Sequence, residues 1–201
     1  MPGKVTYIEI GNIENELQKL IGKHIIAGVA AEEKSVLAQY AGANEFGAII
    51  RPKAGKKYIA IPLQPEFKGK SPKDIPVKFI IKQSKDHTKA VLFIGDIPAF
   101  LLVKSSKIPE RAFLRTTLDN KATIDAIIAK AKYGLRAVLT GKASAETILN
   151  AIGATLVSRI KITISSNLPP ANSGITLRMK NGDVTLIDEG ILLKSISYMV
   201  E

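Results

Sequence analysis

The chain has 201 residues, of which 46% are hydrophobic and 23% are charged, and it contains no cysteine. This composition is typical of a folded soluble protein, and it excludes disulfide frameworks, thiolate metal sites and cysteine nucleophiles. The start of the chain lacks the apolar stretch of a secretory signal, and the longest apolar run, residues 90–103, is too short to span a bilayer. We therefore expect an intracellular protein outside the membrane.

Positive charge is concentrated in one segment. Residues 51–107 hold 13 Lys and Arg against four acids, so they carry +9 of the net charge of +11. The same segment contains six of the ten prolines. We expect residues 51–107 to form a basic, β-rich unit inserted into a body made of residues 1–50 and 108–201.

The first part of the chain predicts alternating helix and strand. Asn12 is expected to cap a short helix that ends near Gly22. The apolar, β-branched run 24–30 predicts a buried strand. Ser35 is expected to cap a second helix, which Gly47 closes.

The basic segment and the C-terminal half follow different patterns. Short apolar runs separated by Lys, Gly, Pro and Asp predict a small antiparallel meander, with strands at residues 58–61, 79–82, 90–94 and 100–103. Beyond Pro109 the apolar spacing predicts helices, one stopped by Gly141 and the next capped by Ser144 and ended before the double proline 169–170. Residues 196–200 predict a final strand. The expected fold is α+β, a mixed helix and strand body with an inserted antiparallel β meander.

No arrangement of residues predicts catalysis. The string GKS at 69–71 is similar to the end of a phosphate-binding loop, but Gln64 stands where the first glycine belongs. Ser158 and Lys161 have the spacing of acyl enzymes without the accompanying motifs. The pair 86–87 (DH) lies in a Lys-rich stretch typical of a surface turn. We expect no enzymatic activity, no metal and no cofactor.

The lysines of the basic segment are candidates for contact with DNA in a channel or with an acidic partner. A concentrated positive field attracts phosphates without sequence specificity. A solvated surface with no nucleic-acid role remains the alternative, because basic patches alone discriminate poorly. The candidates are Lys53, Lys56, Lys57, Lys68, Lys70, Lys73, Lys85 and Lys89.

Three strings of the sequence resemble, in order and spacing, the motifs of one protein family. They are YAGANEFG at 40–47, IPERAFLR at 108–115, and LIDEGILLKSI at 186–196 after the double proline. Together they resemble the neck and tail-completion proteins of tailed bacteriophages. Ala112 and Glu189 depart from the pattern, since the family usually has proline and threonine at those places.

The resemblance implies a structural virion protein of the phage neck or tail, assembled in the host cytoplasm and without enzymatic activity. Copies would form a homomeric ring, six- or twelve-fold, that joins or completes the tail at the head–tail interface. Its partners would be the adjoining connector, collar and tail proteins, with packaged DNA in the channel. The alternative is a small basic nucleic-acid-binding module outside any virion, whose isolated monomer would bind DNA with a strong salt dependence.

Four residues within these strings are candidates for an interface between subunits or neck layers: Glu45, Phe46, Arg111 and Arg115. Arg111 and Arg115 are expected on one helix face, four positions apart. Their guanidiniums could form bidentate pairs with carboxylates of the same chain or of a neighbour, and Glu45 is one candidate. Phe46 is expected to fill the core.

Overall fold

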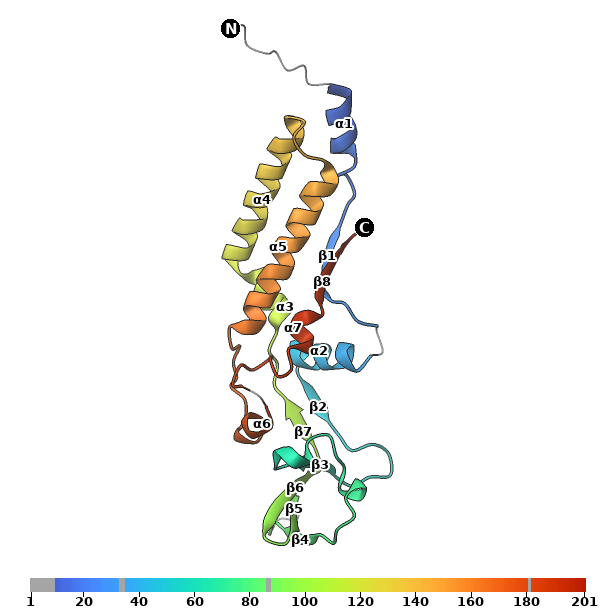
Figure 1. The fold of residues 1–201 in the computed structure, drawn as a ribbon, viewed down its shortest axis with the longest axis vertical. Helices are drawn as coiled ribbons and strands as arrows, with labels where there is room; N and C mark the ends of the chain where they lie inside the picture. The colour runs from blue at the N-terminus through green and yellow to red at the C-terminus, as the bar shows by residue number, and fades with distance from the viewer. Residues whose placement is uncertain (1–9, 33–34, 86–87, 181) are drawn as a thin grey trace. The chain divides into compact units, whose positions relative to one another are not determined.

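The computed structural model describes residues 10–32, 35–85, 88–180 and 182–201. The chain divides into two compact units, each built from segments that are distant in the sequence (Figure 1). The helical unit comprises the chain up to Ala38 together with Phe113–Ser166 and Ile191–Glu201. The sheet unit comprises Gln39–Ala112 and Asn167–Gly190, and the whole segment 51–107 lies within it. The fold class is α+β, as the sequence predicts.

Three consecutive helices make up most of the helical unit, and the two longest pack side by side (Figure 1). They are α3 (Phe113–Asp119), α4 (Lys121–Leu139) and α5 (Ala145–Ser165). Asn120 caps α4 by accepting the backbone N–H of Ala122, and Ser144 caps α5 by accepting that of Thr147. Gly141, with a φ of 67°, follows the end of α4. The predicted stop at Gly141 and cap at Ser144 are confirmed.

An antiparallel ribbon of two strands packs along α5. It pairs β1 (Ile25–Val29) with β8 (Ile196–Val200), so that Ile25 lies opposite Val200 and Val29 opposite Ile196. Both strands are predicted by the sequence. The expectation that the first would be buried is wrong, because β1 has a single partner strand and its residues remain largely half-buried.

Two short helices complete the helical unit, α1 (Ile10–Gln18) and α7 (Ile191–Lys194). Asn12 lies inside α1, so the cap predicted there is wrong. The helical spacing of Ile13 and Leu17 extends one turn upstream to Ile10, and the helix begins there instead. Gly22, with a φ of 73°, lies in the turns that follow.

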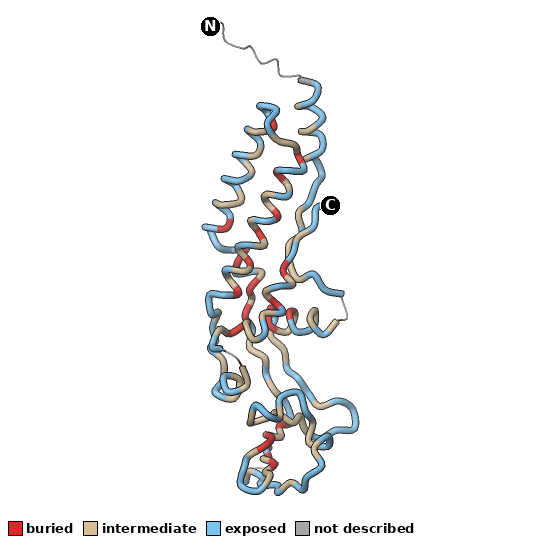
Figure 2. The backbone as a smooth tube through the Cα atoms, in the orientation of Figure 1, coloured by how far each residue is buried: buried red, intermediate tan, exposed pale blue. Residues whose placement is uncertain are grey.

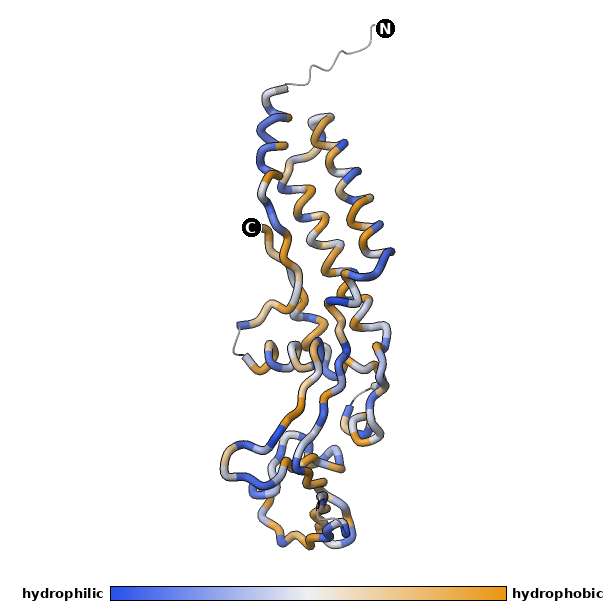
Figure 3. Tube along the Cα trace, turned by 180° about the vertical axis from the view of Figure 1, so that it is seen from behind, coloured by the Kyte–Doolittle hydropathy of each residue, from blue (hydrophilic) through white to orange (hydrophobic). Residues whose placement is uncertain are grey.

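The core of the helical unit lies where α3, α4 and α5 meet (Figure 2). Phe113, Thr117 and Ile164 are fully buried there. Helix α5 is long and apolar enough, by length and composition, to cross a membrane. In this fold one face of α5 packs against α3, α4, β1 and β8, but only 22% of its apolar stretch is buried, and Ile162 is 57% exposed. Figure 3 shows hydrophobic residues recurring along α4 and α5.

Two antiparallel sheets form the sheet unit. Strand β2 (Ala48–Ile50) pairs with β7 (Ser106–Ile108), and four further strands form a sheet in the order β3-β6-β5-β4. Their bounds are β3 (Ile59–Pro62), β4 (Ile80–Gln83), β5 (Lys89–Ile94) and β6 (Ile97–Val103). Strands β4 to β6 form the predicted meander. The remaining predicted strand, β3, does not lie next to β4, its neighbour in the sequence. It pairs instead with β6, which gives the strand order of a Greek key.

The long connection from β3 to β4 covers the core of the four-stranded sheet. It contains two 3-10 turns, η1 (Pro65–Phe67) and η2 (Pro72–Asp74). Ala99 and Phe100 are fully buried, and the rings of Phe67 and Phe79 lie 5.4 and 6.1 Å from that of Phe100. Phe67 and Phe79 pack against this cluster. The connection therefore lies against the core of the sheet and does not join β3 to β4 as a tight hairpin.

Candidate functional site

Helix α2 (Val36–Phe46) carries most of the first motif string, and its ends form as the sequence predicts. Ser35 Oγ accepts the backbone N–H of Ala38 at 3.1 Å. Gly47 leaves the helix with a φ of 72°, and a Cβ there would lie 3.3 Å from the backbone nitrogen of Glu110. The glycine therefore permits both the turn and the close approach of the strings 40–47 and 108–115.

Arg111 joins these two strings to the double proline. Its backbone N–H donates to the carbonyl oxygen of Asn44 at 2.6 Å, and its Nε donates to that of Pro170 at 2.9 Å. Its Nη2 donates to the carbonyl oxygen of Ala171 and to Oδ1 of Asn172, both at 3.4 Å. Arg111 is only 7% exposed, so water has little access to its guanidinium. The oxygens of its own unit stabilise the positive charge by accepting its hydrogen bonds.

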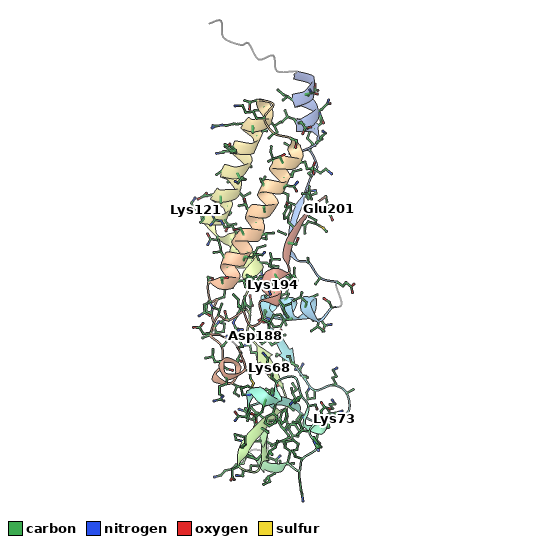
Figure 4. The ribbon with its side chains drawn as sticks, in the orientation of Figure 1. Lys68, Lys73, Lys121, Asp188, Lys194 and Glu201 are labelled. Atoms are coloured by element: carbon green, nitrogen blue, oxygen red, sulfur yellow. The ribbon has the colours of Figure 1, made fainter. Side chains whose placement is uncertain are left out.

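The third string reaches the same neighbourhood through Asp188. Burial raises the pKa of the Tyr40 hydroxyl, while Arg111 lowers it and Asp188 raises it, so the three side chains share one electrostatic environment. Asp188 Oδ2 accepts a hydrogen bond from Nζ of Lys68 at 2.9 Å (Figure 4), and this contact raises the pKa of Lys68.

The segment that carries Asp188 is held by its own hydrogen bonds. Asn167 Oδ1 accepts the backbone N–H of Thr185 at 3.0 Å. Nζ of Lys180 donates to the carbonyl oxygens of Val184 at 2.6 Å and Thr185 at 3.2 Å. Burial lowers the pKa of Lys180. Short helix α6 (Gly174–Met179), which sequence analysis missed, lies in this segment. Hydrogen bonds of Arg111 thus join the strings 40–47 and 108–115 to the double proline, and Asp188 of the third string acts electrostatically on Tyr40. We call this neighbourhood the three-string junction, defined by Tyr40, Asn44, Arg111, Pro170 and Asp188.

The structure corrects two expectations about the interface candidates. Phe46 is 69% exposed and does not fill the core, whereas Glu45 is 3% exposed. The inward face of α2 consists of Ala41, Asn44 and Glu45, at helical spacing, and the next residue points away from it. Arg111 precedes the first residue of α3, so Arg111 and the exposed Arg115 do not share a helix face.

A groove of about 630 Å³ in the sheet unit brings most of the basic candidates together. Basic side chains from residues 51–57 and 70–73 line it beside Tyr58 and apolar residues of β3, β5 and β6. The basic groove contains Arg51, Lys53, Lys56, Lys57, Lys70 and Lys73, which are all exposed. Within the described ranges, no residue lining it is acidic. Arg51 was missed from the sequence, although it opens the basic segment.

The other basic candidates lie elsewhere in the sheet unit. Lys68 forms the ion pair with Asp188. Lys85 and Lys89 are exposed near the connection between β4 and β5 and do not line the basic groove. The pair 86–87, predicted to be a surface turn, lies outside the described residues.

Two of the rejected catalytic motifs lie within the described residues. The string 69–71 leads into the three-residue turn η2, where Asp74 Oδ2 accepts the backbone N–H of Ser71 at 2.9 Å, so no helix N-terminus follows it as in a phosphate-binding loop. Ser158 and Lys161 line a groove of about 660 Å³ along α5. Among the residues that the structure describes, no group of three or more His, Asp or Glu is placed to hold a metal ion.

Comparison of the chain with protein-family models, with curated proteins and with solved structures finds no match.

Proposed function

We propose that this chain is a structural assembly protein of the neck or tail of a tailed bacteriophage, whose copies join into a homomeric ring at the head–tail interface. The three-string junction carries the proposal. Two of the strings that resemble the phage family, 40–47 and 108–115, are far apart in the sequence, and the buried Arg111 joins them to each other and to the double proline that precedes the third. This shared contact supports the resemblance, because it gives the matched residues one common structural role.

The junction acts as architecture. Arg111 binds main-chain oxygens of its own unit, and Glu45 is buried, so both act as internal supports and not as side chains offered to a neighbour. Their contribution to assembly is to hold the end of α2 and the start of β2 in one geometry. A ring requires that geometry, because small errors in the angle between copies prevent closure.

The end of α2 offers an apolar contact surface. Phe46 and Ile49 are 69% and 59% exposed, whereas Ile50, the next residue of β2, faces the other side of the strand and lines the basic groove. Large apolar side chains on a surface are typical of protein–protein contacts. We assign Phe46, the exposed member of the candidate interface set, to the contact between copies.

Native mass spectrometry of the full chain tests the proposal. The unaltered protein should give a closed multimer of defined stoichiometry, and Phe46→Asp should shift it towards the monomer. Val77→Asp is the control, because Val77 is also exposed, at 44%, in the same unit. It should leave the multimer unchanged.

Two outcomes contradict the proposal. One is a protein that remains monomeric at every concentration and binds DNA on its own, as the nucleic-acid-binding module would. The other is absence of the chain from purified phage particles that contain complete necks.

A further inference from the structure

We propose that the basic groove of the sheet unit binds the phosphodiester backbone of nucleic acid. The proposal rests on the groove alone, and it stands whether or not the chain belongs to a phage neck.

The basic groove carries a concentrated positive charge. Six cationic side chains from two separate segments line a groove of about 630 Å³. Like charges on one surface create a positive field that attracts a polyanion. A nucleic-acid backbone supplies a regular row of phosphates, and neutralising it releases condensed counterions, which favours binding.

Among the residues that the structure describes, no ion pair joins a base of the groove to a carboxylate. Asp188 pairs with Lys68, which does not line the groove, and Asp74, the nearest acid along the chain, accepts the backbone N–H of Ser71 through Oδ2. The six bases outnumber this nearby carboxylate, so the groove keeps a net positive charge.

The lining suits a nucleic-acid backbone. Five of the six bases are lysines, which bind phosphates as point charges, and Arg51 adds a planar guanidinium that can bind a phosphate through two hydrogen bonds. Half-buried Tyr58 adds a ring on which a base can stack. A row of carboxylates on an acidic protein offers no base for that ring.

Fluorescence anisotropy tests the proposal with the full chain and two labelled DNA probes of equal length, one duplex and one single-stranded. Binding should weaken as salt rises, with a slope of about −0.9 per phosphate contact for the duplex. The affinity at physiological salt should be modest, with a Kd of roughly 10⁻⁴ to 10⁻⁶ M, as for contacts without base readout.

A triple variant, Lys53→Gln, Lys56→Gln and Lys57→Gln, should weaken binding about tenfold and flatten the salt slope by about 3 for the duplex, since it removes three phosphate contacts. The matched control is Lys78→Gln, Lys104→Gln and Lys107→Gln, which removes the same charge from exposed positions of the same unit that do not line the groove. It should leave the slope unchanged. Lys70→Gln with Lys73→Gln, from the other lining segment, repeats the test should the first triple variant unfold.

Three results would overturn the proposal. The first is no binding of either probe at low salt. The second is an equal loss in the groove and control variants, which would indicate the general field of the unit. The third is displacement of both probes by poly-glutamate at matched charge, which would assign the groove to an acidic protein.

Discussion

Arg111 Nε donates to the carbonyl oxygen of Pro170 at 2.9 Å, so a guanidinium in the first segment of the sheet unit is held by the main chain of the second. Burial lowers the pKa of Arg111, although Tyr40 acts in the opposite direction. The group nevertheless stays charged at neutral pH, because the guanidinium of arginine is not deprotonated in proteins. The charged side chain of Arg111 therefore links the two segments of the sheet unit through hydrogen bonds.

Removing the guanidinium of Arg111 should destabilise the protein. Arg111→Ala should lower the free energy of unfolding by about 2–4 kcal/mol, because it deletes the charge-assisted hydrogen bonds to Pro170 and Ala171 and the packing of a side chain that is itself buried. Arg111→Lys should lower the free energy of unfolding by a smaller amount than Arg111→Ala. It keeps the charge, but an ammonium cannot make the directed hydrogen bonds of the planar guanidinium. Urea denaturation measures both. Arg178→Ala, at an exposed position of the same unit, should stay within about 0.5 kcal/mol of the unaltered protein. Equal losses at Arg111 and Arg178 would contradict the role of Arg111.

Two helical glycines should respond in opposite directions to alanine. A Cβ at Gly153 in α5 would overlap the ring of Tyr198, whereas one at Gly42 in α2 would meet nothing within 4 Å. Gly153→Ala should therefore cost about 1–3 kcal/mol through overpacking. Gly42→Ala should stabilise by about 0.5–1 kcal/mol through reduced chain entropy and better helix propensity. Thermal unfolding of the two variants measures the contrast, and a shift of the same sign in both would refute the packing of β8 on α5.

Glu16 should make the helical unit sensitive to acid. Its Oε1 accepts from Nζ of Lys19 and its Oε2 from the backbone N–H of Ala145, both at 2.6 Å, and these bonds lower the pKa of Glu16 below its ordinary value of 4.5. The unfolded state then binds a proton more readily than the folded state. The stabilisation is complete above the unfolded pKa and is lost as pH falls through the folded pKa.

Thermal unfolding across an acidic pH series checks this assignment. The Tm of the unaltered protein should fall more steeply below pH 4.5, the ordinary value for this group, than that of Glu16→Gln, which cannot titrate. Glu14→Gln is the control, because Glu14 is exposed on the same helix. It should follow the unaltered protein, and an identical pH profile for Glu16→Gln would contradict the proposed role.

The candidate site was only partly predictable. The sequence identifies the basic segment and the three strings because composition and motifs are local properties. It does not reveal that Arg51 and Lys73 line one groove, or that Lys68 pairs with Asp188, since these meetings depend on how the connection between β3 and β4 folds onto the sheet.

Local signals determined where α2 begins and ends and where α5 begins. Ser35, Gly47 and Ser144 act on the backbone within a few residues, so their effect can be predicted without knowing the rest of the fold. Tertiary structure decided that Glu45 turns inward while Phe46 stays exposed, and that β3 pairs with β6. Burial and strand pairing depend on contacts between distant segments. The free energy of those contacts depends on the whole fold, so the periodicity of residues along the chain does not specify them.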